Sequence, residues 1–192
     1  MTQNEGLLLA RGEVSQLMAG GGVFLLLGRH PRANIDLAVE ACIATARRGL
    51  RAVVLDCDRT ITFEAYRSQL AEREASRILL SHLEDVESLA GGLRSAGSMP
   101  DVGLVVLNRA SSLARASDPV VGSREKNALW RTLHPPVSKL SEGRPVLILE
   151  DSRKGEQIEY RVHPALYYLS GTILDAVEDG KSVLHYRIVK RR

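Results

Sequence analysis

The chain of 192 residues has little cysteine, few aromatic side chains and no long hydrophobic run. Two cysteines, Cys42 and Cys57, exclude a disulfide scaffold and a cysteine-rich zinc site, and they fit a reducing compartment. The longest apolar run, residues 23–27, is far too short to span a bilayer. No basic segment leads into an apolar core of the kind that directs secretion. We therefore expect a soluble, cytoplasmic protein that has no membrane partner and no metal site.

An excess of charge of one sign is also lacking. Lysine and arginine together number 26 against 23 aspartates and glutamates, so the formal net charge is only +3. Binding to nucleic acid or membrane through bulk charge needs a larger excess, so any such contact must come from a local patch. Hydrophobic residues make up 44% of the chain, which suffices for one globular domain covering residues 1–192.

Short β-type runs alternate with stretches of helical periodicity. Apolar runs predict strands at residues 23–27, 52–55, 78–80, 102–107 and 145–149. Helical spacing or composition predicts helices at residues 35–47, 63–75, 85–94 and 124–141. This alternation predicts an α/β fold, a doubly wound, mostly parallel sheet in three α/β/α layers. A turn at residues 178–180 predicts a C-terminal hairpin of antiparallel strands, residues 172–177 and 182–189.

The loop after the first strand matches a phosphate-binding P-loop only in part. A P-loop needs a glycine, four residues, a second glycine, a lysine and a serine or threonine, between a strand and a helix. Gly28 fits the first place, but Ala33, Asn34 and Ile35 occupy the last three. Ala33 disfavours the backbone that wraps a phosphate, Asn34 brings no charge, and Ile35 has no hydroxyl for Mg²⁺. We expect the binding of ATP and Mg²⁺ to be weak or absent.

Two other interpretations of this loop remain open. Arg29 or Arg32 could fold back onto an anion at the helix N-terminus, which would give weak nucleotide binding. Alternatively, the segment is a plain turn between strand and helix in a fold unrelated to P-loop proteins.

The order of the other segments resembles the RecA/RadA recombinase superfamily, and more closely the small archaeal RadA paralogues. The resemblance is carried by the glycines at 20–22, by Asp56-Cys57-Asp58 followed by Phe63 and Arg67, and by the closing segments at 163–174 and 186–191. It implies a RecA-like, P-loop-type core. The helical N-terminal DNA-binding domain of full recombinases and their Phe-X-X-Ala polymerisation tether are missing from the pattern.

The resemblance also implies which positions once carried ATP hydrolysis. Asp58 stands where the family has the glutamate that activates water, and Asn108 stands where a strand ends in the Mg²⁺-holding aspartate. Neutral asparagine is a poorer partner than a carboxylate for a hard dication. Glu150 and Asp151 replace a polar pair that senses the nucleotide. Asp58 and Asn108 are thus expected to be vestiges, with no catalytic residue present.

Basic residues near the loops that face DNA in this family are the candidates for contact with single-stranded DNA. They are Arg109, Arg115, Arg124, Lys126, Arg153 and Lys154, with Lys190 and Arg191 in the basic C-terminal stretch. Flexible arginines and lysines can follow a phosphate backbone, although a solvated surface with internal ion pairs has the same composition.

Together these patterns favour a non-catalytic accessory protein, a pseudo-ATPase that assists homologous recombination or DNA repair. The expected partners are a RadA-type recombinase or another RecA-fold paralogue, single-stranded DNA, or a second copy of the chain. One alternative is a weak or atypical ATPase that acts as a nucleotide switch. Another is a regulatory pseudo-ATPase of the circadian-clock-like RecA branch, unconnected with DNA.

Overall fold

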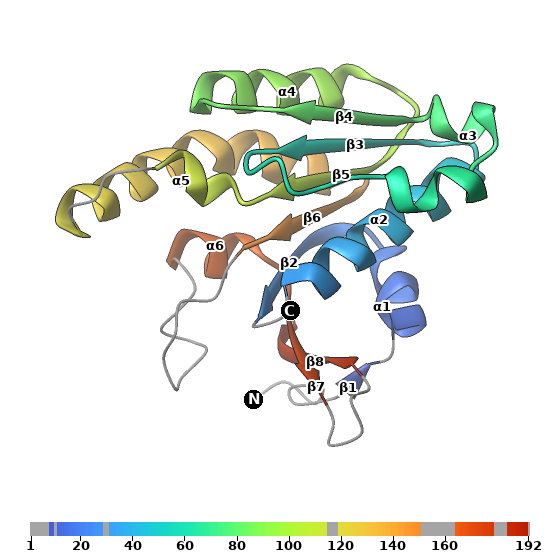
Figure 1. The fold of residues 1–192 in the computed structure, drawn as a ribbon. Helices are drawn as coiled ribbons and strands as arrows, with labels where there is room; N and C mark the ends of the chain where they lie inside the picture. The colour runs from blue at the N-terminus through green and yellow to red at the C-terminus, as the bar shows by residue number, and fades with distance from the viewer. Residues whose placement is uncertain are drawn as a thin grey trace.

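A computed structural model of the chain describes residues 8–9, 11–28, 31–114, 119–150, 164–178 and 184–191 (Figure 1). The described strands form one sheet in the order β1-β8-β7-β2-β6-β5-β3-β4. Their bounds are β1 Leu8–Leu9, β2 Gly22–Gly28, β3 Arg51–Asp56, β4 Ile78–His82, β5 Val102–Asn108, β6 Pro145–Leu149, β7 Thr172–Glu178 and β8 Leu184–Arg191. The strands from β7 to β4 run parallel, whereas β8 pairs antiparallel with β7 and with β1.

Helices cover both faces of this sheet (Figure 1). The bounds are α1 Arg11–Met18, α2 Pro31–Arg47, α3 Glu72–Ala75, α4 Val86–Ser98, α5 Pro119–Ser141 and α6 Pro164–Leu169, with 3-10 helices η1 Glu64–Gln69 and η2 Ala110–Leu113. Helices α1 and α2 pack on one face, and α4, α5 and α6 pack on the other. None of the helices in the described ranges is long and apolar enough to cross a membrane.

The unbroken apolar run of β2 explains its central place. Phe24 and Leu26 pack in the core beneath α1 and α2, while Val23, Leu25 and Leu27 pack in the core beneath α4 and α5. Successive side chains of a strand point to opposite faces, so a strand covered on both faces must be apolar throughout. The predicted three-layer α/β/α fold with a mostly parallel sheet is confirmed.

Two predicted elements differ from the structure. Strand β7 does form a hairpin with β8, but it also pairs in parallel with β2, so the antiparallel part begins at β8. The helix predicted at residues 63–75 is divided into η1 and α3, because Leu70 takes an extended conformation and packs against the core beneath α2. The alternating charges of this segment offer no apolar stripe that would hold one long helix together.

Candidate functional site

The carboxyl ends of β2, β6, β5 and β3 meet at one edge of the sheet, where doubly wound proteins bind their ligands. Gly28 ends β2, Asn108 ends β5, Asp56 ends β3, and Glu150 directly follows β6. The parallel register pairs Asp56 with Asn108. The fold thus brings together the positions that the sequence predicted to be the remains of a nucleotide site.

Asp56 is the centre of a buried polar network at this edge. Its side chain is fully buried, and its Oδ1 accepts hydrogen bonds from Asn108 Nδ2 at 2.7 Å and from the Asp58 amide at 3.1 Å. Its Oδ2 accepts from the Ile61 amide at 3.0 Å and lies 3.5 Å from His82 Nδ1. Both carboxylate oxygens are therefore used within the protein, as burial of such a group requires.

Asn108, which the sequence resemblance aligned with a Mg²⁺-holding aspartate, is directed at its own neighbours. It is buried, and its Nδ2 donates to Asp56 Oδ1 and to Thr60 Oγ1, the latter at 2.8 Å. These two bonds use the two hydrogens of the amide group. The side chain thus ties the end of β5 to β3 and to the segment that follows β3.

Asp58, which the sequence resemblance aligned with a water-activating glutamate, forms an ion pair with Arg109. Both side chains are partly exposed, and Arg109 adopts the left-handed backbone conformation with φ +50°. The Arg109 amide donates to the Leu149 carbonyl at 2.9 Å, which fixes this backbone beside the end of β6. The guanidinium thus neutralises the Asp58 carboxylate, which the sequence resemblance offered as the vestige of a general base.

Glu150 is also engaged inside the protein. Its Oε1 accepts a hydrogen bond from the Ser111 amide at 2.9 Å, and its own amide donates to the Leu26 carbonyl at 3.1 Å. Asp151 lies outside the described residues. Glu150 thus joins the end of β6 to η2.

The first turn of α2 holds the described part of the P-loop-like segment. Asn34 is buried, and its Nδ2 donates back to the Leu27 carbonyl at 3.2 Å. The Ala33 carbonyl accepts from Tyr186 Oη at 3.1 Å, whereas Arg32 is exposed and Ile35 is half-buried. Arg29 lies outside the described residues. The side chain in the place of the P-loop lysine therefore points into the protein.

Cys57 lies between Asp56 and Asp58 and is buried. Burial raises the pKa of its thiol to about 12, and the neighbouring carboxylates of Asp56, Glu150 and Asp58 add to the rise. Its carbonyl accepts from Ser112 Oγ at 3.0 Å. A thiol with so high a pKa carries almost no thiolate at neutral pH and is a poor nucleophile.

The predicted DNA-contacting residues lie on several separate elements. Arg124 is exposed and Lys126 half-buried on α5, and Arg191 ends β8. Arg115, Arg153 and Lys154 lie outside the described residues.

Lys190 is a buried structural cation. Its Nζ donates to the Tyr167 carbonyl and, at 3.0 Å, to the Ser170 carbonyl, and it lies 4.0 Å from the centre of the Tyr167 ring. The ammonium group thus holds the C-terminal end of α6 onto the sheet. We therefore withdraw Lys190 from the set of candidate DNA contacts.

Sequence reasoning missed Thr60, Ile61 and His82, which complete the network around Asp56. They belong to no motif, and only the path of the chain after β3 brings them back to it. A cavity of about 770 Å³ adjoins the network between η1, α3 and β4, where Phe63, Arg67 and His82 are among its lining residues. In the described ranges, no cluster of three or more His, Cys, Asp or Glu side chains could hold a metal ion.

The structure is similar to a solved one, described as the crystal structure of the RadB recombinase. The TM-score is 0.66 at 16% sequence identity, and the similarity covers 96% of this chain and 90% of that one. No protein-family model and no curated protein matches the sequence. At this identity the similarity concerns the fold, because one fold serves many functions. The chain therefore has the RecA-like architecture that its sequence predicted, over almost its whole length.

Proposed function

We propose that this protein is a non-catalytic RecA-fold accessory factor, which assists homologous recombination or DNA repair by binding. The similarity of its fold to that of a RadB recombinase favours this setting. The observation that carries the proposal is the hydrogen bond from Asn108 Nδ2 to Asp56 Oδ1. Through this bond Asn108, at the position expected to hold a metal, becomes part of a hydrogen-bond network within the protein.

The neighbouring positions favour the same conclusion. ATP hydrolysis in a P-loop protein uses a lysine on the phosphates, a carboxylate that holds Mg²⁺ and a group that orients water. The first position is Asn34, which bonds to the Leu27 carbonyl, and the last is Asp58, which is paired with Arg109. Both side chains therefore form their hydrogen bond or ion pair with another group of the protein itself. The cores on both faces of the sheet consist of the chain's own apolar side chains, so such a fold can persist as a scaffold.

In this proposal the protein works by binding and not by turnover. Its expected partners are a RadA-type recombinase or another RecA-fold paralogue, a second copy of the chain, and single-stranded DNA. The DNA surface would consist of Arg124 and Lys126 on α5, the loop residues Arg115, Arg153 and Lys154, and Arg191. Arg109 would join it only by releasing Asp58.

Calorimetry of the full chain with Mg-ATP, together with a phosphate-release assay, tests the non-catalytic role. We expect no micromolar binding and no phosphate release above that of the buffer. Micromolar affinity with measurable hydrolysis would contradict the proposal and favour the nucleotide switch. In that event Arg29→Ala and Arg32→Ala would show which arginine replaces the missing lysine.

Titration of a labelled single-stranded oligonucleotide at several salt concentrations tests the DNA surface. The double variant Arg115→Ala, Lys154→Ala is expected to bind more weakly, with a salt slope reduced by about 0.7 for each lost phosphate contact. The matched control is Arg48→Ala, Arg73→Ala, which removes two exposed cations, one from the turn after α2 and one from α3. Equal binding by both double variants would refute the loop assignment. A pull-down from the native cell then asks whether a recombinase co-purifies.

A further inference from the structure

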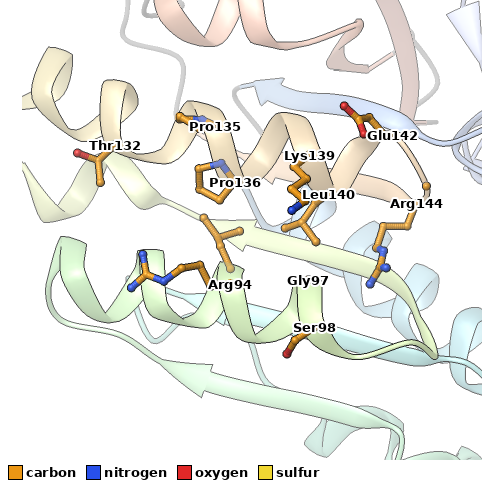
Figure 2. A pocket seen from close by; sticks show the side chains of 12 residues that line it. Arg94, Gly97, Ser98, Thr132, Pro135, Pro136, Lys139, Leu140, Glu142 and Arg144 are labelled. Carbon is orange, nitrogen blue, oxygen red and sulfur yellow. The ribbon is translucent and has the colours of Figure 1, made fainter.

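A groove of about 810 Å³ lies between the C-terminal halves of α4 and α5 (Figure 2). Its lining includes Leu93 and Leu140, whose side chains are buried. Gly97 of α4 faces Leu140, and a Cβ on Gly97 would lie 3.6 Å from Leu140 Cδ2, so the two helices approach closely here. These halves lead into β5 and β6, so the groove lies toward the amino ends of the strands. The network of Asp56 and Asn108 is at the opposite edge.

Cations flank this apolar floor on both sides. Arg94 projects from α4 and Lys139 from α5, and both side chains are exposed (Figure 2). Neither has an ion-pair partner in the part of the chain that the structure describes. The third cation, Arg144, donates from Nη1 to the carbonyls of Ala96 at 3.1 Å and Met99 at 3.3 Å, and so closes the end of α4. Glu142 is the single acidic side chain among the described residues that line the groove.

Two consecutive prolines contribute to one wall of the groove. Pro135 and Pro136 lie inside α5 and line the groove. Proline has no amide hydrogen, so the carbonyls of Arg131 and Thr132, four residues earlier, cannot accept the usual helical hydrogen bond. Thr132 also lines the groove.

We propose that this groove binds an amphipathic helix of a partner protein, whose apolar stripe is flanked by aspartate or glutamate. A depression between two helices suits a third helix that inserts side chains at positions i, i+3, i+4 and i+7. The acidic flanks would pair with Arg94 and Lys139, which favours such a segment over a basic one. The volume is in the range, about 300–1,000 Å³, of cavities that take several apolar groups.

A second copy of the chain is a poorer occupant. Helices α2, α4 and α5 bury their apolar stripes in the cores on the two faces of the sheet, as Leu37, Leu89 and Leu133 illustrate. A folded copy thus offers, within the described residues, no long helix with an unpaired apolar face. The groove lies far from the network around Asp56, on which the proposed non-catalytic role rests. The helix-binding proposal and the proposed non-catalytic role can therefore fail independently of each other.

Selection from a displayed library of random 16-residue peptides against the full chain tests the groove. Thr132→Trp serves for counter-selection, since Thr132 is exposed on the rim and a bulky side chain there would block entry without disturbing the core. We expect enriched peptides that bind the wild type at least tenfold more tightly than the Thr132→Trp protein. Apolar residues at helical spacing and a net negative charge should mark them. Enrichment of basic peptides would overturn the proposal. So would a selection in which no enriched peptide loses its binding in the Thr132→Trp protein.

Charge reversal of the rim provides the second measurement. Fluorescence anisotropy of a selected peptide should show at least tenfold weaker binding to Arg94→Glu, Lys139→Glu. The control Arg48→Glu, Arg73→Glu changes the net charge equally at exposed positions outside the groove and should bind as the wild type does. Unchanged binding by the rim variant, with all melting temperatures equal, would contradict the acidic partner. Sedimentation that shows a dimer abolished by Thr132→Trp would assign the groove to a second copy and equally overturn the proposal.

Discussion

Asn108 Nδ2 lies 2.7 Å from Asp56 Oδ1, and this hydrogen bond joins the ends of two neighbouring parallel strands. The same carboxylate accepts from the backbone amides of Asp58 and Ile61, so it also shapes the turn that leaves β3. A buried carboxylate with several donors stabilises a fold chiefly because its removal would leave those donors without partners. The network around Asp56 is thus expected to be a structural element of this protein.

The first prediction concerns that carboxylate. Asp56→Ala would leave Asn108 Nδ2 and two backbone amides without their acceptor, so the free energy of unfolding should fall by about 3 kcal/mol or more. Urea unfolding followed by circular dichroism measures the loss. The control is Asp58→Ala, whose partly exposed ion pair with Arg109 should contribute less than about 1 kcal/mol. Equal losses in the two variants would show that the network around Asp56 stabilises the fold no more than the exposed ion pair of Asp58 does.

The second prediction concerns the replacement of Asn108 by the aspartate that the sequence resemblance expects there. Asn108→Asp would place a second carboxylate against the fully buried Asp56, and two such groups cannot both ionise without strong repulsion. We expect a loss of about 2–4 kcal/mol at pH 7, because the burial and the repulsion raise the pKa of the introduced carboxyl in the folded state. Because that pKa is raised in the folded state, the loss should shrink as the pH falls toward 5.

Unfolding curves of Asn108→Asp at pH 5 and pH 7 measure this difference, with Asn108→Ala as the uncharged control. A stable variant that gains Mg-ATP hydrolysis would show instead that the single asparagine had silenced a working site.

The contrast between β2 and Lys190 shows which features the sequence could predict. The run from Val23 to Leu27 predicted a strand covered on both faces, because its composition alone excludes a solvated face. The apolar run at residues 102–107 likewise predicted a strand, and so placed Asn108 at its end. The partners of Asp56 and Asn108 could not be predicted, since Ile61 reaches Asp56 and Thr60 reaches Asn108 only through the path of an irregular loop.

Lys190 was misinterpreted because of a local irregularity in strand pairing. Residues 173 and 174 of β7 pair with 190 and 188 of β8, so the register shifts at Val189. Such a bulge reverses the alternation of faces, and it turns Lys190 toward Tyr167 and Ser170 of the α6 side. A basic C-terminal stretch has the composition of a solvated tail, and nothing in it marks the bulge.

The third prediction follows from this burial. Lys190→Met keeps the aliphatic stem but leaves the carbonyls of Tyr167 and Ser170 without their donor, so stability should fall by roughly 1–3 kcal/mol. Affinity for a single-stranded oligonucleotide should stay within twofold of the wild-type value below the melting transition. Thermal unfolding and anisotropy measure the two effects. Weaker DNA binding with unchanged stability would return Lys190 to the DNA surface.

The fourth prediction concerns the two buried thiols. Burial raises the pKa of both Cys42 and Cys57 to about 12, well above the value of about 8.5 for a free thiol. A raised pKa in the folded state contributes stability that is complete below the unfolded pKa and is lost as the pH rises through the folded one. Each thiol should therefore lower the stability by about 1 kcal/mol per pH unit above pH 9.

The stability of the wild type and of the double variant Cys42→Ala, Cys57→Ala at pH 8 and pH 10.5 tests this expectation. The wild type should lose more between the two values, since the alanine variant retains only the titration of the other groups. A thiol reagent at pH 8 should also react with neither cysteine until the protein unfolds. Rapid labelling of the folded protein would contradict the burial of one of the two.

The fifth prediction concerns the prolines inside α5. Each removes a helical hydrogen bond and crowds the preceding turn, a cost of about 3 kcal/mol in an unrestrained helix. Pro135→Ala with Pro136→Ala should raise the free energy of unfolding by about 1–3 kcal/mol, because the greater flexibility of the unfolded chain offsets part of the gain. The control is Pro164→Ala, since Pro164 is the first residue of α6, where proline costs no hydrogen bond. If removal of Pro135 and Pro136 lowers the stability instead, the two rings contribute more by packing than the missing hydrogen bonds cost.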